Sequence, residues 1–133
     1  MILTYIDSGV LIAASRGQDA LSNKAFLALT DPNRLYASSI FVRLEVLPKS
    51  VSYRQAEDRE LYEAFFQTVT CWAEDFSRIT QIACDEAEYH GLRAIDALHV
   101  ASAFTIGATE LITAECHDRP IHKTKIMRVI SIS

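Results

Sequence analysis

Four acidic residues stand in or directly beside the apolar segments of this chain, and its fold has to accommodate their charge. They are Asp7, Glu45, Asp96 and Glu115, which fall after residues 1–6, within 40–47, within 94–104 and after 111–114. An ionised carboxylate that leaves water is strongly destabilised unless a partner offsets its charge. The sequence shows no fixed basic partner beside each acid, so a hard cation is expected to supply the missing charge. The pattern therefore predicts a metal-ion active site.

The bulk properties are those of one soluble globular domain. The 133 residues, of which 50% are hydrophobic, fit a single domain over residues 1–133. The apolar runs are too short to span a bilayer, and the N-terminus shows no secretory signal. The cysteines Cys71, Cys84 and Cys116 show no CxxC spacing, which favours reduced thiols and a cytoplasmic location. The net charge of −4 argues against a protein that holds nucleic acid by bulk charge alone.

Short β-rich segments alternate with segments of helical periodicity. The expected strands cover residues 2–6, 35–38, 70–73, 110–113 and 129–132. The expected helices lie between Ser8 and Gly17, over 19–29, from Ser39 through Glu45, and over 55–69, 77–90 and 94–106. Pro48 is expected to end the third of these helices or to kink it. This alternation predicts one α/β domain with a central, mainly parallel, short-stranded sheet.

Three of the four acids are expected to meet at one edge of this sheet. In open parallel sheets, ligands bind beyond the carboxyl ends of the strands. Asp7 follows the first strand, and Glu115 lies just past the fourth. Asp96 falls in the first turn of its helix, where the macrodipole favours negative charge. Glu45 would have to join them from the middle of a helix. Such an oxygen-rich set suits Mg²⁺ or Mn²⁺ and supports phosphodiester hydrolysis.

Four short motifs surround these acids. They are Tyr5-Ile6-Asp7-Ser8, the segment Ser39 to Pro48 around Glu45, the segment Gly91 to Ala103 around Asp96, and Leu111-Ile112-Thr113-Ala114-Glu115. In this order, and over nearly the whole chain, they resemble the motifs of PIN-domain ribonucleases, in particular the VapC-type toxins of type II toxin–antitoxin pairs. Each motif alone is weak, whereas four in sequence are specific. The resemblance implies a three-layer α/β/α PIN-like fold and an endoribonuclease that depends on Mg²⁺ or Mn²⁺.

The resemblance also implies roles for individual residues. Asp7, Glu45 and Asp96 are expected to be catalytic metal ligands, and Glu115 the fourth acid, which ligates directly or through water. Ser8 and Thr113 are expected to support them by hydrogen bonding. Many relatives have Asp where this chain has Glu115, and Asp118, three residues on, is an alternative for that role.

The partners that the resemblance implies are an RNA substrate, a cognate antitoxin whose helix enters an apolar groove, and a second copy of the chain in a homodimer. Three other functions stay open. They are a PIN nuclease of RNA processing without an antitoxin, a catalytically silent RNA- or protein-binding PIN module, and a hydrolase of small phosphorylated substrates. The intact acids argue against the silent module.

Several other residues allow two interpretations. His99 is expected to be a packed, hydrogen-bonded core histidine rather than a group that acts on the leaving group. Cys116, His117 and His122 do not have the spacing of a recognised zinc site. The aromatic residues Tyr62, Phe65, Phe66 and Trp72 are expected to pack in the core or in a dimer rather than to stack on bases. The basic residues between Arg119 and Arg128 either meet phosphate or form a solvated loop.

Overall fold

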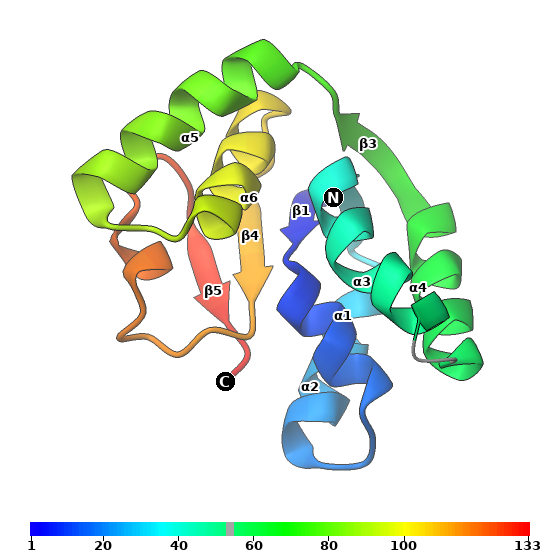
Figure 1. The fold of residues 1–133 in the computed structure, drawn as a ribbon. Coiled ribbons are helices and arrows are strands. Elements are labelled where there is room, and N and C mark those ends of the chain that lie inside the picture. Colours follow the sequence, from blue (N-terminus) through cyan, green and yellow to red (C-terminus); the bar gives the residue numbers. More distant parts are fainter. Residues whose placement is uncertain (53–54) are drawn as a thin grey trace.

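The computed structural model describes residues 1–52 and 55–133 (Figure 1). Within these ranges, five parallel strands form one sheet in the order β3-β2-β1-β4-β5. The strands are β1 (Ile2–Ile6), β2 (Arg34–Ser39), β3 (Val69–Ala73), β4 (Glu110–Thr113) and β5 (Val129–Ser131). The expected short-stranded parallel sheet is confirmed.

Helices cover both sides of the sheet, which confirms the three-layer α/β/α arrangement (Figure 1). The described helices are α1 (Ser8–Ser15), α2 (Ala20–Leu29), α3 (Ile40–Ser52), α4 (Ala56–Thr68), α5 (Phe76–His90), α6 (Ala94–Thr105) and the 3₁₀ helix η1 (Pro120–Lys123). Helix α5 packs along α6, α1 packs on α2, and α3 packs on α4. Helix α6 also contacts β2, β3 and β4, as its apolar composition leads one to expect.

The central strand β1 and its neighbour β4 show why the sheet is covered on both sides. In β1 and β4, Tyr5, Ile6 and Leu111 are completely buried, although neighbouring side chains of a strand point to opposite faces. A strand that is apolar on both faces is typical of parallel sheets that lie between two layers of helices. These two strands therefore form the rigid centre from which the acidic residues emerge.

The strand order places a crevice at the carboxyl ends of β1 and β4. From β1 the chain goes first to β2 and β3 on one side, and later to β4 and β5 on the other. A reversal of this kind leaves a gap beyond the strand ends where ligands bind. The backbone N–H of Asp7 donates to the carbonyl oxygen of Ile112 at 3.0 Å, which fixes Asp7 at this gap.

Helix α3 excludes one of the two alternatives expected at Pro48. The helix does not end at Pro48 but continues to Ser52. Proline removes one backbone hydrogen bond of a helix, to the carbonyl group four residues earlier. Pro48 and Leu44 are both exposed on α3, so water can bond to the carbonyl group that proline leaves free. By contrast, α5 ends as expected at Gly91, whose φ of 68° is left-handed and suits glycine.

No helix in the described part of the chain is both long enough and apolar enough to cross a membrane.

Candidate active site

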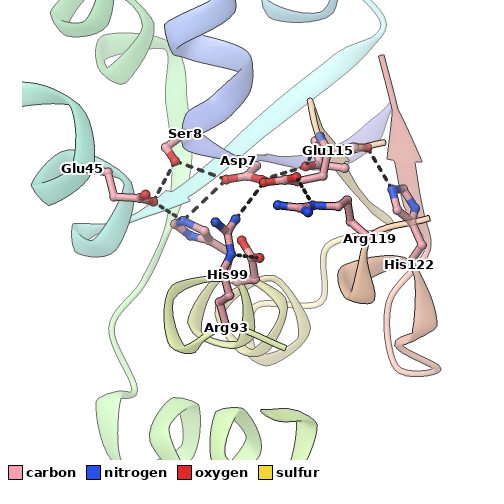
Figure 2. A network of polar contacts seen from close by, with 10 residues as sticks. Asp7, Ser8, Glu45, Arg93, His99, Glu115, Arg119 and His122 are labelled. Carbon is pink, nitrogen blue, oxygen red and sulfur yellow. Dashed lines mark hydrogen bonds and ion pairs between the residues drawn. The ribbon is translucent and has the colours of Figure 1, made fainter. Parts of the chain in front are cut away.

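A pocket of about 260 Å³ opens at the carboxyl edge of β1 and β4. It brings together the four acids that the sequence singled out, and Ser8, Gly9, Ile12, Arg93 and Ala114 complete its lining. Figure 2 shows the labelled polar side chains of this lining gathered together: Asp7 after β1, Ser8 of α1, Glu45 of α3, Arg93 just before α6 and Glu115 after β4. The four acids come from four separate parts of the chain, so the tertiary fold alone creates this concentration of negative charge.

Asp7 is held by the strand next to its own. It is almost fully buried between β1 and α1, and its Oδ2 accepts a hydrogen bond from the buried Thr113 hydroxyl at 2.8 Å. The same Thr113 oxygen accepts from the backbone N–H of Glu115 at 3.1 Å. Thr113 therefore connects the first and fourth acids. The second carboxylate oxygen of Asp7 stays toward the pocket, near Ser8.

Glu45 reaches the pocket from the middle of α3. Its Oε1 accepts from the Ser8 hydroxyl at 2.7 Å and lies 2.6 Å from Nε2 of His99. The Ser8 hydroxyl also lies 3.3 Å from Asp7, but its single proton is better placed for Glu45. Burial disfavours the charged form of Glu45, yet the hydrogen bonds from His99 and Ser8 outweigh it, so the pKa of Glu45 is lowered. The carboxylate is therefore ionised and fixed in position.

His99 links the pocket to the protein core. It is completely buried, and its Nδ1 lies 2.8 Å from the Tyr5 hydroxyl, which in turn lies 2.7 Å from the Ser39 hydroxyl. Burial lowers the pKa of His99, but the hydrogen bond to Glu45 and the charges of the neighbouring carboxylates raise it more, so the net pKa is above its usual value. The expected buried, hydrogen-bonded histidine is confirmed, and its partner is one of the four acids.

Asp96 and Glu115 share a basic partner, which the sequence interpretation missed. Nε of Arg93 donates to Asp96 Oδ2 at 3.1 Å, and Nη2 of Arg93 donates to Glu115 Oε1 at 2.7 Å (Figure 2). The expectation that the acids have no fixed basic partner is therefore wrong for these two, and also for Glu45 where His99 is protonated. Burial still raises the pKa of Asp96, helped by the charge of Asp7, because Arg93 offsets only part of the cost.

The segment after β4 holds Glu115 at the rim of the pocket. Nε of Arg119 donates to Glu115 Oε2 at 3.2 Å, and His122 donates from Nε2 to the Glu115 backbone carbonyl at 3.0 Å. The first of the basic residues between Arg119 and Arg128 thus lies beside the acids. Asp118 is exposed and does not line the pocket, so the structure does not bring it to the other acids.

The donor atoms fit a divalent cation. Within the described ranges, one group of potential metal ligands lies close together: Asp7, Glu45 and His99 each offer an atom within 4.8 Å of the others. Carboxylate oxygens suit Mg²⁺ or Mn²⁺. His99 uses Nε2 for Glu45, so it serves better as a partner of a ligand than as a ligand. Asp96 and Glu115 line the same pocket but turn to Arg93.

The described residues offer no second metal site. Cys116, His117 and His122 do not form a group of converging ligands, although the two imidazole rings lie 5.2 Å apart. The aromatic residues of α4 and β3 pack in or against the core, which is one of the two expected arrangements. Tyr62, Phe65 and Phe66 are buried, and Trp72 packs at 5.8 Å from the Phe66 ring.

Sequence reasoning missed the roles of two residues in this pocket. Arg93 has a signal in the sequence, because it stands three positions before Asp96 at the start of a helix, where such side chains meet. Its second partner, Glu115, is 22 positions away and has no such signal. For His99, the sequence predicted burial and a hydrogen bond but could not name Glu45 as the partner.

Known proteins share this fold and sequence pattern. A chain of a toxin–antitoxin complex from Klebsiella pneumoniae superposes on this one with a TM-score of 0.73 and 20% sequence identity, covering 98% of both chains. A chain of VapBC2 from Rickettsia felis, bound to a DNA fragment from the VapBC2 promoter, has a TM-score of 0.71 and 15% identity over 98% of both chains. A chain of DNA-bound VapBC from Salmonella typhimurium has a TM-score of 0.69 and 14% identity over 100% of both chains. At these identities the likeness concerns the fold. A search among curated proteins found no match to this sequence. The sequence model of the PIN domain matches residues 4–116, and the chain therefore belongs to the PIN domain family.

Proposed function

We propose that this chain is a metal-dependent endoribonuclease and the VapC-type toxin of a type II toxin–antitoxin pair. The observation that carries the nuclease part is the convergence of four carboxylates in one pocket at the carboxyl edge of the central strands. Membership of the PIN domain family and the fold shared with toxin–antitoxin complexes support the toxin part.

Asp7, Glu45 and Asp96 are the proposed ligands of Mg²⁺ or Mn²⁺, and Glu115 completes the set directly or through water. A divalent cation held there supplies stabilisation of the negative charge that develops on a phosphodiester during hydrolysis. The chain supports its ligands with neutral donors, because Thr113 donates to Asp7 and Ser8 donates to Glu45. These bonds fix the orientation of the two carboxylates before any substrate binds.

RNA is the proposed substrate, and the surface beside the pocket supports this choice. A second hollow of about 330 Å³ shares Ile12 and Glu45 with the first and is flanked by Arg16 and Lys49. Both basic side chains are exposed, so they are free to contact the backbone phosphates of a strand that enters the pocket. Arg119 at the opposite rim provides a third positive charge.

The deciding experiment offers purified protein a mixed RNA pool with Mg²⁺ or Mn²⁺ and, separately, with EDTA. We expect cleavage that needs the metal and disappears in Asp96→Asn, with circular dichroism showing that the variant is folded. Single nucleotides are offered in parallel, because their hydrolysis would favour a hydrolase of small substrates. Cleavage that survives both EDTA and the substitution would refute the proposed site.

An apolar groove supports the proposed antitoxin partner. Phe26 and Leu29 of α2 and Leu61 and Phe65 of α4 line a hollow of about 190 Å³, and the Phe26 side chain is 54% exposed. A groove of this kind suits the apolar face of a partner helix. If a small protein is encoded next to this gene, its coexpression with this chain should give a complex that lacks nuclease activity, and Phe26→Asp should weaken that complex. If no such complex forms, an antitoxin-independent PIN nuclease becomes the better proposal.

We also propose that residues 1–133 form one domain that acts in the cytoplasm as a homodimer. Light scattering after size exclusion measures the mass of the assembly in solution. A mass near twice the chain mass of 14.9 kDa supports the dimer, and a mass near 14.9 kDa contradicts it.

A further inference from the structure

Arg93 occupies an unusual position for a basic residue beside a proposed metal site. It lines the pocket and its guanidinium group bridges two of the acids, with donors 3.1 Å from Asp96 Oδ2 and 2.7 Å from Glu115 Oε1. The two acids belong to different elements, the first turn of α6 and the segment after β4. One planar cation thus holds together two carboxylates that the chain brings from separate places.

The bridge divides the four acids into two pairs. Asp7 and Glu45 offer oxygen atoms to the close group of potential ligands, whereas Asp96 and Glu115 are outside that group in the described structure. Both of the latter carboxylates are instead bonded to Arg93 (Figure 2). A divalent cation that used all four acids would therefore compete with the guanidinium group for the negative charge of these two carboxylates.

We propose that Arg93 is a resident counter-cation of the pocket, which competes with the divalent metal for Asp96 and Glu115 and thereby sets the metal affinity of the protein. This inference rests on the proposed metal site. It assigns to Arg93 a positioning role: the side chain keeps the acidic pocket together while the metal is absent and releases two ligands when the metal arrives.

Because Arg93 is exposed, its release from the two carboxylates requires little free energy. Its side chain is 59% exposed, so the guanidinium group exchanges its carboxylate partners for water with a small change in free energy. Asp96, in contrast, is buried and cannot turn to solvent in the same way. The movable partner of this bridge is therefore the arginine.

A titration of Mn²⁺, followed by the electron paramagnetic resonance signal of the free ion, tests the proposal without any substrate. We expect Arg93→Gln to bind Mn²⁺ about tenfold more tightly at low ionic strength, the size of effect that one unit charge has on a nearby divalent ion in water. Arg119→Gln is the matched control. Arg119→Gln removes the same charge and an ion pair of 3.2 Å to Glu115 but leaves the contacts of Asp96 unchanged. The affinity of this variant for Mn²⁺ should therefore rise less than that of Arg93→Gln.

Equal or weaker binding of Mn²⁺ by folded Arg93→Gln would overturn the inference, because Arg93 would then be neutral or would preorganise the ligands. An equal gain in both variants would overturn it too, since overall charge would then explain the effect. If the unchanged protein binds no Mn²⁺, the proposed metal site itself fails, which is a separate result. A second measurement needs no variant: the Nε–H signal of Arg93 in nitrogen-15 spectra should shift on saturation with Mg²⁺, and an unchanged signal contradicts the release.

Discussion

Nε2 of His99 lies 2.6 Å from Oε1 of Glu45, although the two residues are 54 positions apart in the chain. His99 is completely buried on α6, and Glu45 stands in the middle of α3. The packing of α3 against α6 therefore fixes the orientation of Glu45, one of the proposed ligands. It also explains how a glutamate with a flexible side chain can point into the pocket at a defined angle, as a proposed ligand must.

Replacement of His99 should damage both the stability and the metal site. His99→Leu leaves the buried Tyr5 hydroxyl and the Glu45 carboxylate without their imidazole partner, so the free energy of unfolding should fall by about 1–3 kcal/mol. Urea unfolding measures this loss, and Mn²⁺ titration of the folded variant should show weaker binding. His117→Gln is the control, because His117 is exposed. Comparable losses in both variants would mean that the His99 contact has no special role.

The same contact predicts a pH dependence for the metal-free protein. The pKa of His99 is raised above 6.5, so its contribution is complete below pH 6.5 and is lost as the pH rises through the folded value. The pKa of Glu45 is lowered from 4.5, so its contribution is present above pH 4.5 and is lost as the pH falls through the folded value. The pair should therefore stabilise the fold most between pH 4.5 and 6.5.

Comparison with His99→Leu in EDTA isolates this effect from other titrating groups. Asp7, Glu45, Asp96 and Tyr5 all face His99, and all four side chains are present in both proteins, which differ only in the imidazole and in the contacts that it makes. The difference in free energy of unfolding between the two proteins should be largest between pH 4.5 and 6.5 and should shrink toward about pH 9. A difference that stays constant with pH would show that the imidazole does not take up a proton when the chain folds.

The fold was largely predictable because its signals are local. Apolar segments such as residues 2–6 and 110–113 predicted the strands, and Gly91 predicted the end of α5. Of the two alternatives at Pro48, the helix end was wrong, because the effect of a proline inside a helix depends on its surroundings. The exposed position on α3 allows water to replace the missing bond, and exposure is a property of the tertiary structure.

The site was predictable in outline and not in its contacts. Asp7 and Asp96 stand at ends of elements, where the strand order and the helix dipole give a physical reason for a carboxylate. The partner of Glu45 depends on how α3 packs on α6, and the second partner of Arg93 depends on where the segment after β4 turns. No spacing rule encodes either contact, so charge balance in the pocket could not be read from the sequence.

Asp96→Asn should make the metal-free protein more stable. Burial raises the pKa of Asp96, which means that folding penalises its charged form at neutral pH, and the amide removes this penalty and the repulsion from Asp7. In EDTA we expect the melting temperature to rise by a few degrees, which corresponds to a gain of up to about 1 kcal/mol in the free energy of unfolding for a domain of this size. Saturating Mn²⁺ should raise the melting temperature of the unchanged protein but not of the variant. A variant that melts earlier in EDTA would mean that the Arg93 ion pair outweighs the burial cost.

A contact at the amino-terminal ends of the strands, opposite the active site, should affect stability without affecting the active site. Glu110 begins β4, is 3% exposed, and accepts from Thr4 Oγ1 and from Arg34 Nε, each at 2.8 Å. Arg34→Met leaves this buried carboxylate with only the threonine, so urea unfolding should show a loss of about 3 kcal/mol. The affinity for Mn²⁺, measured well below the melting temperature, should not change, because Glu110 and Thr113 stand at opposite ends of β4. Weaker Mn²⁺ binding by the folded variant would show that strain at one end of β4 reaches the pocket at the other.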